Sequence, residues 1–355
     1  MRLRRPGPDS PRSGMPLGLN VVVVLAVAVL LAAGAALLIW LALGRPPVWQ
    51  VSGWTTANSF EFAKIVLALI GGVGAVVALV VAYRKQHLGE AAERREDIKL
   101  FAERFTKAAD QLGSDKAPVR LAGMYALEDL AQGTPSQRQT IVNVLCAYLR
   151  MPYLAPDTAV EQEENERRQQ EKQVRLTAQR ILAAHLRPGD GSTPASTFWR
   201  GVDLDLTGAT LLDVDFTGCH FGSVRFNEAE FSGSALFHEA EFNGRAWFSG
   251  VRFGRNATFE RARFHRSVWF FSGNFAGSAG FAGVKFLDSV SFAKAEFSGA
   301  AVFSKAEFNA YVMFNQAKFG QRVEFGVEQF ESPAVIEGAQ VRDEATGEWV
   351  GLTIS

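Results

Sequence analysis

Hydrophobic positions divide the chain into an apolar N-terminal part, an amphipathic middle and a periodic C-terminal part. Two runs near the N-terminus, Val21–Leu43 and Ile65–Tyr83, contain no charged residue. At the rise of an α-helix they reach about 35 Å and about 28 Å, close to the thickness of a bilayer core. The pattern predicts two membrane-spanning helices. A signal peptide is the alternative for the first run, which is longer than the apolar core of such a peptide.

Lys and Arg residues near the ends of these runs predict their orientation. Four arginines precede the first run and five Lys or Arg residues follow the second, whereas the segment between them carries only Arg45 and Lys64. Both termini are therefore expected on the cytoplasmic side of a bacterial plasma membrane. Small residues such as Gly71, Gly74 and Ala78 allow close helix approach, which leaves open a contact with the first span or a homodimer.

Residues 84–187 show the apolar spacing of amphipathic helices, interrupted by short Gly, Ser and Pro segments. This predicts a cytoplasmic α-helical module, either one helix pair of the armadillo or HEAT type or a small unit that packs on its neighbours. Residues 156–172 are highly charged and are expected to form a loop or a solvated helix face. A helical pattern resumes from Lys172 to Arg187.

The spacing of Phe is the strongest pattern in the chain, because 23 of the 28 Phe lie between Phe216 and Phe330. Leu or Phe recurs every five residues from Leu206 to Leu236, and from Phe237 the interval alternates between five and six. A small residue, usually Ala or Val, stands two positions before nearly every one. Residues i−2 and i point to the same side of an extended chain, so each segment sends one small and one large group inward.

This periodicity predicts a chain that turns a corner every five or six residues and closes a coil every 20 to 22 residues. Phe rings would then stack from coil to coil, while Phe271 falls outside the pattern. The predicted structural ladder consists of Phe242, Phe264, Phe286, Phe308, Phe330, Phe248, Phe270, Phe292, Phe314, Phe253, Phe275, Phe297, Phe319, Phe259, Phe281, Phe303 and Phe325.

Units such as Ala229-Glu230-Phe231-Ser232-Gly233 resemble those of pentapeptide-repeat proteins. The resemblance covers residues 198–341, although the six-residue intervals depart from the strict pattern and look like a Phe-rich variant. It implies a right-handed quadrilateral β-helix. The helical stretches upstream, Phe105–Tyr153 and Arg175–Arg187, are similar to regions that precede such repeats in actinobacterial membrane proteins.

The expected fold is thus a two-span membrane helical hairpin, a cytoplasmic helical module and a β-helix. The expected domains are a disordered arm (1–16), a first span (17–44), an external loop (45–64), a second span (65–83), the helical module (84–187), a linker (188–196), the repeat domain (197–341) and a C-terminal cap (342–355).

Composition excludes several classes of protein. The chain has 37 Lys+Arg and 37 Asp+Glu, and this balance argues against a basic nucleic-acid coat. The two cysteines, Cys146 and Cys219, are too few for a disulfide framework. The sequence contains no phosphate-binding glycine loop and no nucleophile elbow. We therefore expect no enzymatic activity, no metal and no cofactor.

Some pentapeptide-repeat proteins imitate DNA and bind a topoisomerase, which implies a strongly acidic surface. Residues 201–336 hold 12 Lys+Arg and 15 Asp+Glu, so this function is disfavoured. A basic cluster that would suit an acidic partner or anionic lipid headgroups is formed in the sequence by Arg245, Arg252, Arg255, Arg261, Arg263 and Arg266.

The leading hypothesis is a membrane-anchored, non-enzymatic interaction scaffold. Its partners would be the lipid bilayer and an unidentified protein, with no direct nucleic-acid contact. The alternatives are a regulator or sensor that acts on another membrane protein through its spans, a topoisomerase-binding DNA mimic and an unrecognised enzyme.

Overall fold

The computed structural model describes residues 26, 30, 33, 34, 37, 41, 56–189, 191, 193–325, 334–343 and 345–353. The chain divides into two compact units, one that ends at Leu100 and one that begins at Phe101. Helix α2 (Thr56–Leu112) is continuous across this division. Within the part of the chain that is described, no helix has both the length and the apolar character that a membrane crossing needs.

The predicted two-span hairpin therefore has no support from the described residues. The first predicted span (17–44) lies almost entirely outside them. The second (65–83) lies inside α2, together with residues 56–64 of the predicted external loop. No break separates these segments: residues 56–112 contain no Pro, and the helix continues through Gly71, Gly72 and Gly74.

The helical module continues with α3 (Ala117–Gly133), the short 3-10 helix η1 (Pro135–Gln137), α4 (Arg138–Leu149) and α5 (Gln162–Leu186). A Cβ at Gly123 would lie 2.8 Å from the carbonyl oxygen of Ala108, so glycine allows α3 to pack closely on the last turns of α2. The charged stretch 156–172 is helical from Gln162 onward, where ion pairs one turn apart support the helix.

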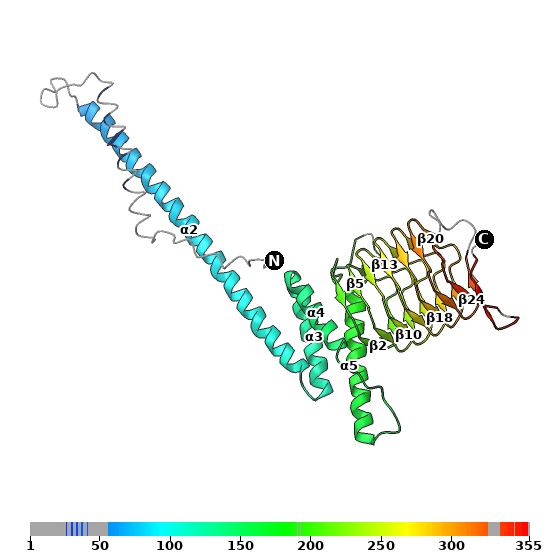
Figure 1. The fold of residues 1–355 in the computed structure, drawn as a ribbon. Helices are drawn as coiled ribbons and strands as arrows, with labels where there is room; N and C mark the ends of the chain where they lie inside the picture. Colours follow the sequence, from blue (N-terminus) through cyan, green and yellow to red (C-terminus); the bar gives the residue numbers. More distant parts are fainter. Residues whose placement is uncertain are drawn as a thin grey trace, which may run out of the picture. The chain divides into compact units, whose positions relative to one another are not determined.

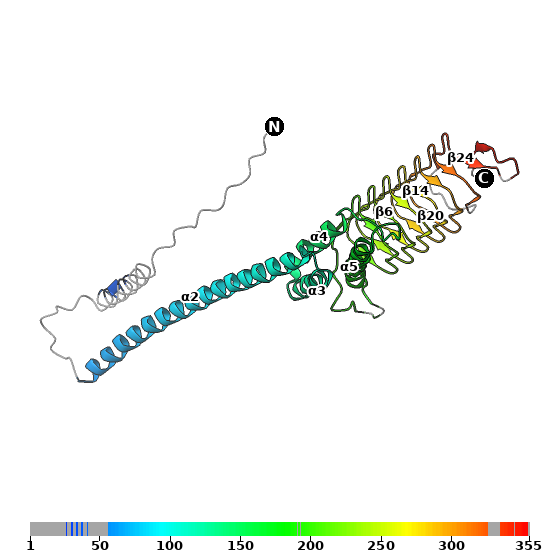
Figure 2. The same ribbon diagram turned by 90° about the horizontal axis from the view of Figure 1, so that it is seen from below.

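From Leu204 onward the chain forms a right-handed β-solenoid with four sides, each a sheet of short parallel strands (Figures 1 and 2). Side A contains β1 (Leu204–Asp205), β5 (Val224–Arg225), β9 (Ala246–Trp247), β13 (Val268–Trp269), β17 (Val290–Ser291) and β21 (Val312–Met313). Side B contains β2 (Thr210–Leu211), β6 (Glu230–Phe231), β10 (Arg252–Phe253), β14 (Asn274–Phe275), β18 (Glu296–Phe297), β22 (Lys318–Phe319), β24 (Gln340–Arg342) and β25 (Trp349–Gly351).

Side C contains β3 (Val214–Asp215), β7 (Ala235–Leu236), β11 (Ala257–Thr258), β15 (Ala279–Gly280), β19 (Ala301–Val302) and β23 (Val323–Glu324). Side D contains β4 (His220–Phe221), β8 (Glu241–Phe242), β12 (Arg263–Phe264), β16 (Lys285–Phe286) and β20 (Glu307–Phe308). The chain visits the sides in the order A, B, C, D, so A faces away from C and B away from D.

The register of the strands reproduces the spacing of the sequence. Leu211 pairs with Phe231 in the first coils, whereas Phe253 pairs with Phe275 in the later ones, so that each later coil is longer by two positions. The predicted quadrilateral β-helix and its two coil lengths are therefore confirmed. At its C-terminal end, β25 turns back antiparallel on β24, and Leu352 is buried there.

The coils approach so closely at some corners that only glycine fits. A Cβ at Gly299 would lie 2.6 Å from both the carbonyl carbon and the oxygen of Gly277 in the coil before it. We expect Gly299→Ala to lower the free energy of unfolding by about 1–3 kcal/mol, because the backbones of two coils must separate. Chemical denaturation of the full chain measures this change.

The matched control is Gly280→Ala on side C. The nearest atom to a Cβ at Gly280 is the flexible Oε1 of Glu260, 3.4 Å away. This substitution should leave stability unchanged or raise it by up to about 1 kcal/mol, because glycine weakens a strand through its backbone entropy. Equal losses in both variants would mean that backbone approach does not decide the effect.

Candidate functional site

The interior of the solenoid is a continuous stack of Phe rings. Along each side, neighbouring ladder rings lie parallel with centroids 4.4–5.2 Å apart. The ladder residues up to Phe319 are buried, Phe325 is half-buried, and Phe330 lies outside the described residues. Apart from the buried thiol of Cys219, the side chains that fill the described interior of the solenoid are apolar, because the buried Ser291 holds an outward position of side A, in register with Trp269. Any function must reside on outward positions or in the helical module.

Outward positions on side B form two pairs of opposite charge, separated by the neutral Asn274. Arg252 lies 3.3 Å from Glu230, and Lys318 lies 3.6 Å from Glu296. Exposed pairs of this kind contribute about 0–1 kcal/mol each, so their main effect is to neutralise the surface.

Side D carries both signs of charge, with Arg263 and Lys285 adjacent between Glu241 and Glu307. The guanidinium of Arg263 lies 3.4 Å from the carboxylate of Glu241, which also lies 3.7 Å from the ring of His220. Further along, Lys285 donates a hydrogen bond of 2.8 Å to Glu307. Neither side therefore presents the uniform row of negative charge that imitation of DNA requires.

The six arginines of the sequence cluster do not form one surface. They span positions 245–266, a stretch that makes one full coil and so visits all four sides. Two of them lie on strands, Arg252 on side B and Arg263 on side D. The other four lie at corners: Arg245 and Arg266 before side A, Arg255 after side B and Arg261 after side C. Three of them, Arg252, Arg261 and Arg263, pair with glutamates of the preceding coil. Proximity in the sequence was thus the wrong guide to a basic patch.

Side A has a different character that the sequence analysis missed. The rings of Trp247 and Trp269 stack with centroids 5.7 Å apart, and the guanidinium of Arg225 lies 5.1 Å from the ring centroid of Trp247. The three residues occupy the same position in successive coils, so comparing outward residues at the coil period would have found them.

The helical module covers the open N-terminal edge of the solenoid (Figure 1). The side-chain amide of Gln179 in α5 donates to the carbonyl oxygen of Leu212 at 2.7 Å and accepts from its N–H at 2.9 Å. Gln139 in α4 makes the same two bonds with Asp203. These amides replace the strand that a preceding coil would supply, which satisfies backbone groups at an otherwise open edge.

A buried histidine fixes the junction between the module and the first coil. The ring of His185 stacks on Trp199 with centroids 3.9 Å apart. Its Nδ1 lies 2.6 Å from the carbonyl oxygen of Thr197 and its Nε2 lies 2.7 Å from Glu128. Both ring nitrogens have partners within the protein, so the histidine has a structural role at this junction.

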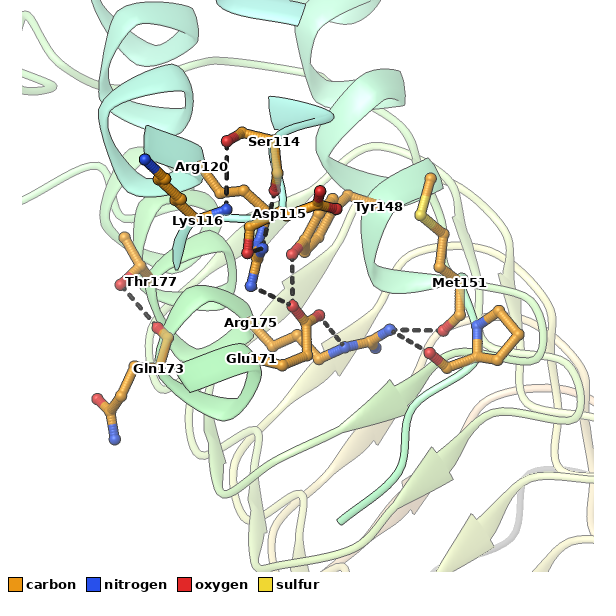
Figure 3. Close-up of polar contacts among 11 residues, drawn as sticks. Ser114, Asp115, Lys116, Arg120, Tyr148, Met151, Glu171, Gln173, Arg175 and Thr177 are labelled. Carbon is orange, nitrogen blue, oxygen red and sulfur yellow. Dashed lines mark hydrogen bonds and ion pairs between the residues drawn. The ribbon is translucent and has the colours of Figure 1, made fainter. Parts of the chain in front are cut away.

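Arg175 and Glu171 are the centre of a polar cluster in the helical module (Figure 3). Arg175 is buried and donates to Glu171 and to the carbonyl oxygens of Leu149, Met151 and Pro152. These bonds hold the end of α4 against α5.

The second oxygen of Glu171 accepts hydrogen bonds from Arg120 at 3.2 Å and from the hydroxyl of Tyr148 at 2.8 Å. Burial, together with the Glu171 carboxylate, raises the pKa of Tyr148 well above its usual range. An open cleft of about 1040 Å³ lies beside the cluster, but the cluster's charged groups bond to each other and to the backbone. The cluster therefore holds helices together rather than presenting free acids or bases.

Burial raises the pKa of both thiols, Cys146 and Cys219, to about 12. The thiolate is the reactive form, so we expect neither to be alkylated by iodoacetamide at pH 8 in the folded full chain, and both to react in urea. Because only the unfolded thiols ionise between pH 9 and 12, their contribution to stability is present below pH 9 and is lost as the pH rises through this window. Fast labelling of either thiol in the folded chain, followed by mass spectrometry, would contradict the burial.

The described residues contain no group of three or more His, Cys, Asp or Glu side chains that could hold a metal ion. In the comparison with known families, a model described as pentapeptide repeats (9 copies) matches residues 226–272 and 281–326. No curated protein and no solved structure matches the chain.

Proposed function

Because this chain is a pentapeptide-repeat protein with helices before its β-solenoid, we propose that it is a membrane-anchored, non-enzymatic interaction scaffold. The solenoid would present its sides to a protein partner at the cytoplasmic face of a bacterial plasma membrane.

The observation that carries the proposal is the contrast between the inside and the outside of the coils. Inward positions repeat Phe with a small residue two positions before it, except in the first coil, where Leu206 and Leu211 take the place of Phe. Outward positions differ from side to side: charge pairs on B and D, an aromatic and basic stripe on A, and small residues such as Gly280 on C. A uniform core with variable faces suits binding, because outward residues can be chosen without disturbing the fold.

Two features support the anchor. The charge-free runs are flanked by Lys and Arg on the sides that become cytoplasmic in the proposed topology. Apolar side chains of α2 are also exposed in the structure: Val76 is 56% exposed and Leu79 is 73% exposed. Apolar surface of this kind favours contact with lipid or with another helix.

The test is membrane retention of the full chain. After expression in bacteria and an alkaline carbonate wash, the chain should remain in the membrane pellet, and chemical crosslinking should join it to a second protein. Val76→Lys combined with Leu79→Lys should lower the retained fraction, because each buried lysine costs about 2.5–3.5 kcal/mol at the centre of a membrane helix. Complete release should also require a pair of lysines in the first charge-free run, Val21–Leu43.

The matched control is Ile98→Lys, which adds a charge to an exposed position of α2 beyond the apolar run. It should leave retention unchanged. Release of the unaltered chain by carbonate would contradict the anchor, and a retained chain that forms no crosslink would contradict the scaffold.

A further inference from the structure

Side A continues its aromatic character at both edges. Just beyond β13, Phe271 is 42% exposed, and the ammonium of Lys294 lies 5.6 Å from its ring centroid. At the opposite edge, Tyr311 directly precedes β21 and is 66% exposed. Together with Trp247 and Trp269 they give one flat side a set of outward aromatic rings, whereas the strands of sides B and D carry charge pairs.

The same side carries an excess of positive charge. Its cations are Arg225, Arg245, Arg266 and Lys294. None of these four makes an ion pair with a residue that the structure describes. Of its acids, Asp203 and Asp205 belong to the first coil, where Asp205 pairs with Arg150 of α4 at 3.0 Å and also attracts Arg225, its neighbour in the next coil. Only Glu228 and Asp288 lie at the edges of the later coils that carry the aromatic rings. Beyond the first coil, the balance of side A is therefore positive.

We propose that side A docks on a membrane surface that contains anionic lipid headgroups. The inference rests on the proposed membrane anchoring, which would keep the solenoid close to a bilayer. Trp and Tyr prefer the headgroup region of a membrane, and each nearby Lys or Arg adds about 1 kcal/mol of attraction to an anionic leaflet. Side A combines outward aromatic rings with a positive charge balance, whereas the charges of sides B and D neutralise each other. Side A therefore matches a planar anionic surface better than sides B and D do.

The experiment uses the full chain reconstituted into phosphatidylcholine vesicles with or without phosphatidylglycerol. The fluorophore NBD is attached to the thiol introduced by Phe271→Cys, and the native thiols, which are buried, stay unlabelled. In vesicles with phosphatidylglycerol we expect a blue shift of the emission and quenching by spin-labelled lipid. The matched control is Leu236→Cys on side C, 37% exposed in the native chain, where we expect neither change.

A pair of charge variants tests the cause of docking. Arg245→Gln with Arg266→Gln should lower the ratio of docked to undocked chain about fivefold per arginine. Arg252→Gln with Arg263→Gln changes the same number of charges on sides B and D, and should leave the quenching at position 271 unchanged.

Equal quenching at positions 271 and 236, or none at 271 with phosphatidylglycerol, would overturn the docking proposal. So would shielding of position 271 only in native membranes, with a protein crosslinked there, because side A would then bind a protein. A carbonate wash of the same vesicles separates the two proposals: a retained but unquenched chain overturns only the docking, whereas a released chain overturns the anchor.

Discussion

Phe270→Ala is expected to lower the free energy of unfolding by about 3–5 kcal/mol. The ring of Phe270 is fully buried and stacks on Phe248 and Phe292, with centroids 4.7 Å and 5.0 Å away. Its removal leaves a cavity that the rigid coils on both sides cannot close. Chemical denaturation of the full chain in detergent, followed by the near-ultraviolet circular dichroism signal, measures the loss.

The neighbouring residue supplies the control. Phe271→Ala removes the same side chain from a position that is 42% exposed, and we expect a change below about 0.5 kcal/mol. Similar losses for the two variants would contradict the assignment of alternate residues to the core and the surface.

Arg175→Met is expected to destabilise the helical module by about 3–5 kcal/mol. The substitution leaves the carboxylate of Glu171 without its closest cation and leaves the carbonyl oxygens of Leu149 and Met151 without a donor. The side chain of Arg175 is only 1% exposed and its bond to the carbonyl oxygen of Leu149 is buried, so water can reach the 27% exposed Glu171 but does not readily replace the bond to Leu149. The denaturation midpoint of the helical signal of the full chain measures the effect.

Arg167→Met is the matched control in the same helix. Arg167 also pairs with a glutamate four residues earlier, Glu163, but its side chain is 69% exposed. We expect a change of about 0.3–0.5 kcal/mol, the usual contribution of such a pair on a helix surface. If both variants were equally stable, Arg175 would not hold the end of α4.

The sequence predicts the solenoid well because a single residue type, Phe, recurs at the period of the coils. Once Phe alternates at five and six positions, the length of each coil and the stacking of Phe264 on Phe242 and Phe286 follow from geometry. The small residues two positions earlier fill the space that the rings leave, as at Ala262.

The contacts that close the N-terminal edge could not be predicted in the same way. Gln139 and Gln179 look like ordinary polar helix residues, and nothing local shows that their amides bind the backbone of Asp203 and Leu212. Arg175 likewise follows a charged stretch in which Arg167 is exposed, and nothing local distinguishes the two arginines. Its burial depends on how α4 and α5 pack, and this is tertiary information.

The six arginines of the sequence cluster are dispersed for a geometric reason. Residues close in sequence, such as Arg252 and Arg263, lie on opposite sides of a coil, whereas residues one coil apart, such as Trp247 and Trp269, lie side by side. In a solenoid, surface patches must be sought along the coil period.

The most direct test of the scaffold is side-resolved photocrosslinking of the full chain in its native membrane. A photoreactive residue replaces one outward residue on each side in turn: Arg225 on A, Asn274 on B, Thr258 on C and Lys285 on D. We expect a lipid adduct at Arg225 and a discrete protein adduct on at least one other side, both retained after an alkaline wash. The same faint labelling on all four sides, or a chain that the wash removes, would contradict it.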